Sequence, residues 1–387
     1  MEQMISRMRN IAVVIPKFGL VGGAEQFVAL LTRRLHADHG FQFSVLTNRW
    51  EGHHPGVTFS KVPILTFPKY LTTPSFAWFV RRRLSAGKFD LIHSHDRIFA
   101  ADLFTLHGIP HRYWVRNIRQ KRMSLYDIAT AWMEKILVCE GGCRKFVAVS
   151  NLTKDIFLQE YPVDPEKVSV IHPGVEPEDY RIPDRETVRA AIRAGYGISE
   201  DETVLVFASM NFEIKGLDTI LEALGHLKTR GISARLIVAG KGNEKKYARL
   251  ARDAGVAANV IFTGRLDKDR LIHHYLAGDA YIMLSVFDTF GMVVLEAMAA
   301  GLPVIVSGNV GAKDVVREGE NGFVIHDVTD TRYIATKIHC MTDPATRRTL
   351  SQAALDTARQ NTWVAAAEKY SRLYNAIIEE KEKGAAD

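Results

Sequence analysis

The chain contains, at residues 285–303, the stretch SVFDTFGMVVLEAMAAGLP, which carries two carboxylates, Asp288 and Glu296. Gly291 lies between them and predicts a turn that leads into a helix of small and apolar residues. We expect Asp288 in a loop at the helix entrance and Glu296 a little more than one turn inside it. Both carboxylates and the positive end of the helix then face one crevice. A carboxylate there can accept both hydroxyls of a ribose while backbone N–H groups bind phosphate, so the stretch predicts a nucleotide site.

Around this stretch, apolar strand-like runs alternate with amphipathic helical runs along the whole chain. One series begins with IAVVIP at 11–16 and ends with VSVIHPG at 168–174. A second series begins with TVLVFAS at 203–209 and ends with PVIVS at 303–307. Strands rich in Val and Ile that are separated by helices indicate parallel sheets covered on both faces. Two such series predict two doubly wound α/β domains, joined by a charged, Pro-rich linker near 173–185.

The composition favours a two-domain protein that binds an anionic partner. The 387 residues, 47% of them hydrophobic, are enough for two separate cores. No run approaches the roughly 18 uninterrupted apolar residues of a membrane-spanning helix, and the N-terminus is typical of a first strand and not of a signal peptide. Three cysteines suit a reducing cytoplasm. The net charge of +6 is compatible with nucleic acid, acidic lipid or sugar phosphate.

The stretch 285–303 resembles the signature of retaining glycosyltransferases of the GT-B fold, in the large group called family 4. In that signature two Glu residues flank seven others, and a helix and a Gly-x-Pro turn follow, here Gly301-Leu302-Pro303. This chain has Asp288 in place of the first Glu, whereas Glu296 matches the second. The resemblance implies an enzyme that transfers a sugar from a nucleotide-sugar donor.

The resemblance also implies a division of the chain. The GT-B fold has two doubly wound Rossmann-like domains that face a central cleft. We expect an N-terminal acceptor-binding domain at 1–175 and a C-terminal domain that binds the nucleotide sugar at 176–361. The C-terminal helix, 362–387, is expected to pack back on the N-terminal domain, and its apolar residues form one stripe.

Further site residues follow from the same resemblance. Lys215, at the mouth of a predicted helix, is placed to neutralise a diphosphate leaving group, and Arg265 matches a position that is often basic in the family. His107, in the run LFTLHGIP, resembles the His that reaches the transferred sugar. The predicted catalytic residues are Lys215, Arg265, Asp288 and His107. The predicted donor-binding residues are Gly22, Gly23, Lys215, Gly240, Arg265, Phe290, Gly291, Met292 and Glu296.

Two short runs offer an alternative as metal sites. HSHD, at 93–96, places two His residues on one face of a strand end, but no distant ligand set is evident. Asp267-Lys268-Asp269 spells the acid-x-acid motif of metal-dependent glycosyltransferases, but it opens a predicted helix, where acids serve as caps. We therefore predict no metal site and no cofactor, with the nucleotide sugar as a substrate.

A basic segment at 111–122, HRYWVRNIRQKR, precedes a predicted amphipathic helix with an apolar stripe that includes Leu125, Ile128, Trp132 and Met133. Basic residues beside such a stripe suit attachment to an anionic membrane surface. The alternative is a solvated basic loop beside a core helix. No recognition motif for nucleic acid accompanies the charge. The predicted membrane or acceptor residues are Arg112, Arg116, Arg119, Lys121 and Arg122.

Several other segments, among them WEGHHPG at 50–56 and the IHPG turn at 171–174, resemble bacterial lipopolysaccharide core glucosyltransferases. This resemblance implies UDP-glucose as donor, a lipopolysaccharide core or related glycolipid as acceptor, and a peripheral position on the cytoplasmic face of the inner membrane. Two alternatives use the same nucleotide site: an epimerase or hydrolase of nucleotide sugars with the GT-B fold, or a non-catalytic protein that binds nucleotide sugars.

Overall fold

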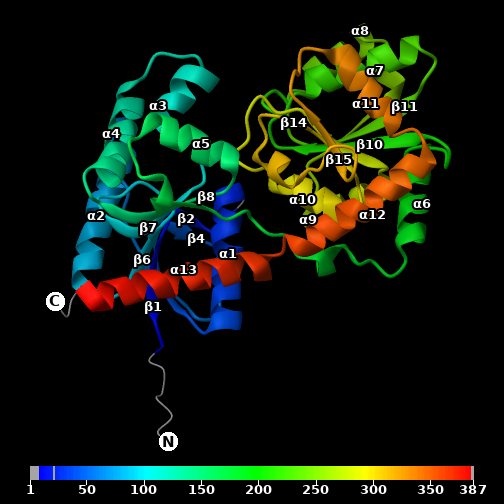
Figure 1. Cartoon of the computed structure of the whole chain (residues 1–387). Coiled ribbons are helices and arrows are strands. Elements are labelled where there is room, and N and C mark those ends of the chain that lie inside the picture. Colours follow the sequence, from blue (N-terminus) through cyan, green and yellow to red (C-terminus); the bar gives the residue numbers. More distant parts are fainter. Residues whose placement is uncertain (1–7, 21, 385–387) are drawn as a thin grey trace, which may run out of the picture. The chain divides into compact units, whose positions relative to one another are not determined.

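The computed structural model describes residues 8–20 and 22–384. The chain forms two compact units, one made of 1–173 together with 363–387 and the other of 174–362 (Figure 1). Each unit has its own parallel sheet between layers of helices, which confirms the predicted class of two Rossmann-like domains.

The first unit contains a seven-stranded parallel sheet, in the order β5-β3-β1-β6-β7-β8-β9. Its strands are mostly buried, and β7 is buried along its whole length, as expected of strands covered on both faces. A separate pair, β2 (Lys17–Phe18) and β4 (Arg49–Trp50), lies outside this sheet. The strands of the sheet are β1 (Asn10–Val14), β3 (Gln42–Thr47), β5 (Val57–Lys61), β6 (Leu91–Ser94), β7 (Ala101–Leu106), β8 (Cys143–Ala148) and β9 (Val168–Val170).

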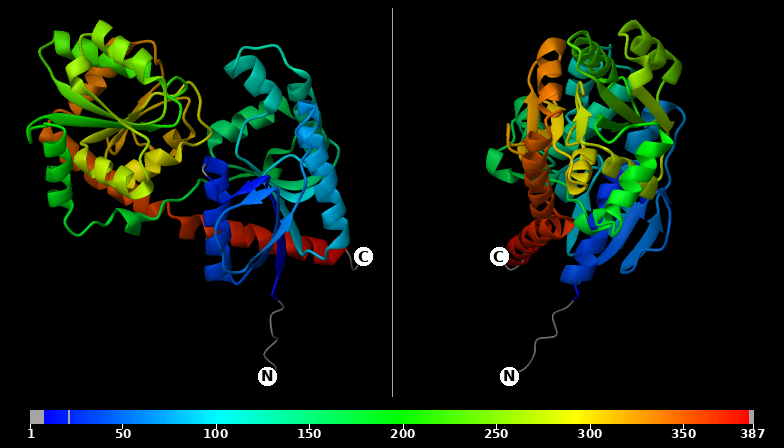
Figure 2. Two further views of the ribbon diagram at one scale, coloured as in Figure 1. Left: turned by 180° about the vertical axis from the view of Figure 1, so that it is seen from behind. Right: turned by 90° about the vertical axis from the view of Figure 1, so that its right-hand side faces the viewer.

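Helices α2 (Thr72–Ala86), α4 (Leu125–Cys139) and α5 (Asn151–Glu160) pack on one face of this sheet and share one hydrophobic core with it. Helices α1 (Gly23–His39) and α13 (Trp363–Gly384) lie side by side elsewhere on the unit (Figures 1 and 2).

Helix α13 is joined to the sheet by polar contacts as well as by packing. The Tyr374 hydroxyl is 2.6 Å from Nδ1 of His93 on β6, and the Tyr370 hydroxyl is 3.0 Å from the Thr105 hydroxyl on β7. Lys381 Nζ donates to Asp102 Oδ2 on β7 at 2.6 Å. These buried side chains of the sheet therefore obtain their hydrogen-bond partners from the C-terminal helix.

The second unit contains a six-stranded parallel sheet, in the order β12-β11-β10-β13-β14-β15. Helices α7, α8 and α11 cover one face, and α6, α9, α10 and α12 lie on the other (Figure 1). The strands are β10 (Thr203–Ser209), β11 (Ala234–Gly240), β12 (Val260–Gly264), β13 (Ala280–Met283), β14 (Val304–Ser307) and β15 (Gly322–Ile325). The helices are α6 (Arg185–Gly195), α7 (Leu217–Thr229), α8 (Glu244–Asp253), α9 (Lys268–Ala277), α10 (Met292–Ala299), α11 (Thr331–Cys340) and α12 (Pro344–Gln360).

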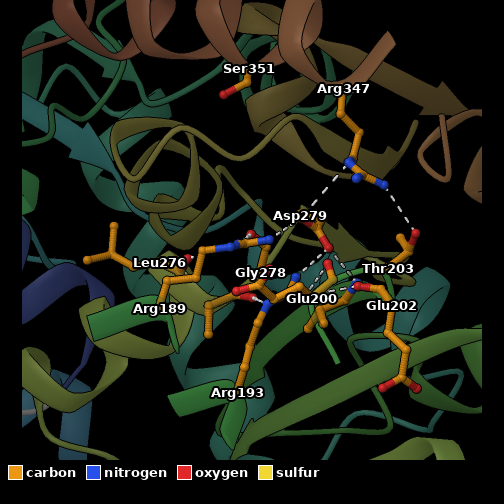
Figure 3. A network of polar contacts seen from close by, with 12 residues as sticks. Arg189, Arg193, Glu200, Glu202, Thr203, Leu276, Gly278, Asp279, Arg347 and Ser351 are labelled. Carbon is orange, nitrogen blue, oxygen red and sulfur yellow. Dashed lines mark hydrogen bonds and ion pairs between the residues drawn. The ribbon is translucent and has the colours of Figure 1, made fainter. Parts of the chain in front are cut away.

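A network of arginines around Asp279 fastens the amino ends of β10 and β13 (Figure 3). Asp279 accepts hydrogen bonds of 2.7 Å from both Arg189 and Arg193, and its Oδ2 also accepts the Val204 N–H at 2.8 Å. Arg193, only 3% exposed, donates further to the carbonyl of Ala277. The network lies at the opposite end of the sheet from the loop of Asp288, which follows the carboxyl end of β13.

Several predicted bounds differ from those of the structure. The basic segment, for which no helix was predicted, forms a short helix α3 (His111–Tyr113) and one turn of π-helix (Trp114–Ile118). The predicted linker contains a 3₁₀ helix, Pro177–Tyr180. The C-terminal helix ends at Gly384, and the last residues of its predicted range lie outside the described part of the chain.

Candidate active site

The turn predicted at Gly291 is present where β13 leads into α10. Gly291 caps the helix in the left-handed conformation, with φ of 87°, and a Cβ at this position would lie 2.7 Å from the Met283 side chain. Only glycine adopts this conformation readily and fits that space. Asp288 lies in the loop before the helix, and Glu296 lies within the helix, as the sequence predicted.

Lys215 and Asp288, predicted to have separate roles, form an ion pair. Lys215 Nζ donates a hydrogen bond to Asp288 Oδ2, and both side chains are largely buried. The approach depends on Gly216, whose φ is 72°, because a Cβ there would lie 2.2 Å from the Leu284 carbonyl oxygen. Backbone bonds hold the other side of the loop, since the Asp288 N–H donates to Asn309 O at 3.0 Å.

Glu296 is half-buried and lies close enough to Tyr180, Tyr275 and Tyr281 to interact with each of them electrostatically. Burial raises the pKa of the Glu296 carboxyl to about 6, although Lys268 and the Tyr275 hydroxyl act in the opposite direction. The three tyrosines were not predicted as site residues, because they come from separate segments and carry no motif. Lys268 was considered only as the middle residue of the acid-x-acid run.

The side chains of the remaining residues predicted to bind the donor are not part of the ion pair of Lys215 and Asp288. Arg265 is exposed in the turn after β12, and none of the interactions among the described residues connects it to Lys215 or Asp288. Gly240 has a φ of 124°, and a Cβ there would lie 1.7 Å from Ser209 O, so the pairing of β10 with β11 by itself requires glycine. Phe290 is buried, whereas Met292, at the start of α10, is half-buried.

Gly22, Gly23 and His107 belong to the first unit. Gly22 is the N-cap of α1, and Gly23 is its first residue. A Cβ at Gly23 would meet no atom within 4 Å, and one at Gly22 would meet only the Glu25 side chain. The start of this helix is therefore open at Gly23, whereas the Glu25 carboxylate lies beside Gly22.

His107 follows β7 and is held by a second histidine. Its Nε2 is 2.8 Å from Nδ1 of His95, and its ring lies edge-on to Phe27 with 4.8 Å between the centroids. Burial lowers the pKa of His107 to about 3, so the imidazole is neutral at pH 7. His93 is bound to Tyr374 and Thr105. Among residues 8–20 and 22–384, no group of three or more His, Cys, Asp or Glu side chains is arranged to hold a metal ion.

Asp267, the first residue of the acid-x-acid run, caps a helix as predicted. Its carboxylate accepts the Arg270 N–H at 2.9 Å at the start of α9. Lys268 instead forms an ion pair with Asp179.

The basic segment is exposed, but the apolar stripe beside it is not continuous. Met133 is fully buried in the core, whereas Leu125, Ile128 and Trp132 are at least half exposed. The predicted single stripe of α4 is therefore wrong: one face packs on the sheet and another faces solvent. Trp78 of α2 is also exposed, and the Arg82 guanidinium lies 5.0 Å from its ring centroid. The exposed basic residues are Arg112, Arg116, Arg119, Lys121 and Arg122.

None of the helices in residues 8–20 and 22–384 has the length and hydrophobicity of a membrane span.

Two family models match the chain, one in each half. The model described as "Glycosyltransferase Family 4" matches residues 21–179, and the model described as "Glycosyl transferases group 1" matches residues 188–357. The chain is 28% identical over 409 residues to a D-inositol 3-phosphate glycosyltransferase of Stackebrandtia nassauensis, covering 95% of this chain and 89% of that protein.

Solved structures of other proteins share the fold. WaaG, a glycosyltransferase involved in lipopolysaccharide biosynthesis, superposes with a TM-score of 0.75 and 21% identity, covering 94% of this chain and 99% of WaaG. Anabaena HepE in complex with UDP-glucose superposes with a TM-score of 0.72 and 17% identity, covering 95% of this chain and 99% of HepE.

Proposed function

Because the chain is a GT-B glycosyltransferase that consists of a family 4 domain and a group 1 domain, we propose that it moves glucose from UDP-glucose to a glycolipid, with retention of configuration. The observation that carries this proposal is the arrangement around α10. Glu296 lies within the helix, and Lys215 is paired with Asp288 at its entrance. A carboxylate for ribose and a cation for diphosphate therefore lie in one unit of the chain.

In the proposed reaction, the ionised Glu296 accepts hydrogen bonds from the ribose hydroxyls. Lys215 stabilises the negative charge that develops on the departing diphosphate, and Arg265 supplies a second cation. Asp288 and the backbone near Gly291 bind hydroxyls of the transferred sugar. Because Lys215 is paired with Asp288 in the free protein, donor binding has to exchange this carboxylate for the diphosphate as the partner of the lysine.

The remaining predicted residues have supporting roles in this proposal. Phe290, Met292 and Gly240 line the nucleotide, while Gly22 and Gly23 allow the diphosphate to approach α1. The neutral His107 donates a hydrogen bond to the transferred sugar. The leaving phosphate takes the proton of the acceptor hydroxyl on the same face, so the reaction requires no metal ion, no cofactor and no dedicated protein base.

The acceptor we propose is the core of lipopolysaccharide or a related glycolipid, at the cytoplasmic face of the inner membrane. The exposed basic segment and the exposed Trp78 and Trp132 support an acceptor embedded in an anionic membrane. A phosphorylated inositol is a second candidate, since relatives of this chain carry the name D-inositol 3-phosphate glycosyltransferase. These relatives and both family models favour a transferase over the alternatives of an epimerase, a hydrolase or a non-catalytic binding protein.

Binding of nucleotide sugars tests the donor assignment. In a panel that varies base and sugar, UDP-glucose should raise the melting temperature most. Glu296→Ala should weaken uridine binding at pH 7.5 about 10-fold or more, because it removes hydrogen bonds to a charged group. Glu244→Ala, at an exposed position on α8, is the matched control and should bind uridine normally.

The pH dependence makes this test specific for the carboxylate. Glu296 is ionised above a pKa of about 6, so the affinity of the unaltered protein for uridine should decline as the pH falls from 7.5 to 5. Uridine carries no phosphate that would itself titrate in this range. The Ala variant should show no such decline. Equal affinity of variant and parent at pH 7.5 would rule out Glu296 as the ribose ligand.

Membrane attachment is tested by flotation with lipid vesicles. Replacing Arg116 and Arg119 by Ala should weaken binding to vesicles of phosphatidylglycerol by roughly 5-fold for each residue, and added salt should weaken binding of the parent protein. Replacing Arg249 and Arg252, which are exposed on α8 of the second unit, is the matched control. Equal losses in both double variants would mean that total charge, and not the basic segment, directs the binding.

A further inference from the structure

The first unit contains a cavity of about 250 Å³ at the carboxyl end of β7. It is bounded by the loop that carries His107 and Gly108, by Arg97 and Glu134, and by apolar side chains that include Phe157. A cavity of this size has room for one small ring.

Arg97 is held rigidly at this cavity. Its Nε donates to Glu134 Oε2 at 2.7 Å, and Glu134 is itself fixed because its Oε1 accepts the His111 N–H at 2.9 Å and the Tyr161 hydroxyl at 2.8 Å. The Glu134 carboxylate therefore accepts a hydrogen bond from Nε of Arg97 and leaves the terminal nitrogens of the guanidinium to other partners. Among the described residues, the terminal nitrogens have a single long contact, with Nη1 3.6 Å from Asp96 Oδ1.

The charges at the cavity leave no excess for an anion. Among the described residues that line the cavity, the cation Arg97 is accompanied by the carboxylate of Glu134, and Asp96 lies next to Arg97 in the chain. His95 and His107, which also line the cavity, are neutral at pH 7 because burial lowers the pKa of each. A hydroxyl both donates and accepts hydrogen bonds and needs no surplus charge, so a hydroxyl-bearing ring suits these balanced charges better than phosphate does.

We propose that this cavity binds the uncharged, hydroxyl-bearing ring of the acceptor, with Arg97 as a specificity-determining residue and Glu134 as the residue that positions it. The terminal nitrogens of Arg97 donate to ring hydroxyls, and the apolar wall that includes Phe157 packs on the C–H face of the ring. His107, whose Nε2 is bonded to His95, lies at the edge of the cavity and reports on its occupancy. A phosphate on the acceptor then lies outside the cavity. The proposal rests on the proposed transferase function and names the class of ring that its acceptor presents.

Binding of small polyols tests the proposal without the natural acceptor. Arg97→Lys keeps the charge and loses the planar fork, so saturation-transfer NMR should show at least a 10-fold loss of affinity for myo-inositol or D-glucose. Its affinity for UDP should stay unchanged. Arg372→Lys, an exposed ion-pair residue on α13, is the matched control and should bind both ligands normally. If the unaltered protein does not bind UDP, the donor assignment is contradicted. The proposal for the cavity is then still decided by the affinity for polyols alone.

A second measurement needs no substitution. In protein with labelled histidines, myo-inositol should shift the imidazole resonances of His107 and leave those of His226, in the second unit, unchanged. Two outcomes would overturn the proposal. One is polyol binding that is equal in Arg97→Lys and the parent protein. The other is binding of inorganic phosphate that Arg97→Lys abolishes while myo-inositol produces no shift at His107.

Discussion

Replacing Lys215 by alanine should lower the turnover of UDP-glucose about 100-fold, which is the usual loss when one preorganised group that stabilises transition-state charge is removed. The affinity for uridine, which lacks the diphosphate, should change little. The reason is that Lys215 is the cation bound at the entrance of α10, where the developing charge of the departing diphosphate would lie. Single-turnover kinetics with a saturating donor measures the effect directly.

Two comparisons separate loss of the cation from indirect damage. Lys241→Ala removes an exposed lysine of the same unit and should leave turnover unchanged. Lys215→Arg keeps a positive charge beside Asp288 and should lose less turnover than Lys215→Ala. Turnover near that of the parent in Lys215→Ala would refute the role of the lysine.

Replacing Asp279 by alanine should destabilise the second unit by about 3–5 kcal/mol, the typical cost of removing one partner of a buried ion pair. Arg193 is 3% exposed and would keep its charge without a carboxylate, and the Val204 N–H would lose its acceptor. The shared network of Arg189, Arg193 and Asp279 joins α6 to the turn before β13, so the loss should also loosen α6 (Figure 3). Urea denaturation, followed by far-UV circular dichroism, measures the change in the free energy of unfolding.

The matched control for Asp279 is Glu320→Ala. Glu320 pairs with Arg317 three residues away on the surface, where ion pairs contribute less than about 1 kcal/mol. The midpoint for Asp279→Ala should therefore fall well below that of the control. Coincident unfolding curves for the two variants would show that the arginines find other partners, such as the carbonyl groups they already contact.

The sequence predicted the two sheets well wherever a strand is a run of Val and Ile. It missed β7, ADLFTL, because Asp102 interrupts the apolar run near its start. Asp102 is 8% exposed and is neutralised by Lys381, which lies far along the chain, so no local signal could indicate that this polar residue belongs inside. The strand β15 was also missed, because it is only four residues long and its first residue, Gly322, belongs to an Asn-Gly pair, which is typical of a turn.

At the candidate site, the sequence predicted the helix entrance but not the contacts across it. The positions of Asp288 and Glu296 relative to Gly291 follow from short-range turn and helix geometry. The pairing of Lys215 with Asp288 depends on how closely two separate loops approach, which is decided by tertiary packing around Gly216. The prediction for α4 was wrong for a different reason. Helical spacing identifies the apolar faces of a helix, but it does not show which of these faces packs against the rest of the protein.

The contacts of α13 with β6 and β7 affect the order in which the two units can complete their folding during synthesis. Domains generally fold as units while the ribosome adds residues, the earlier one first. Here the helix that supplies partners for His93 and Asp102 is translated only after the entire second unit. Until then these two side chains remain without those partners inside a nascent sheet, which is costly for buried polar groups. The unit encoded first is therefore the one completed last.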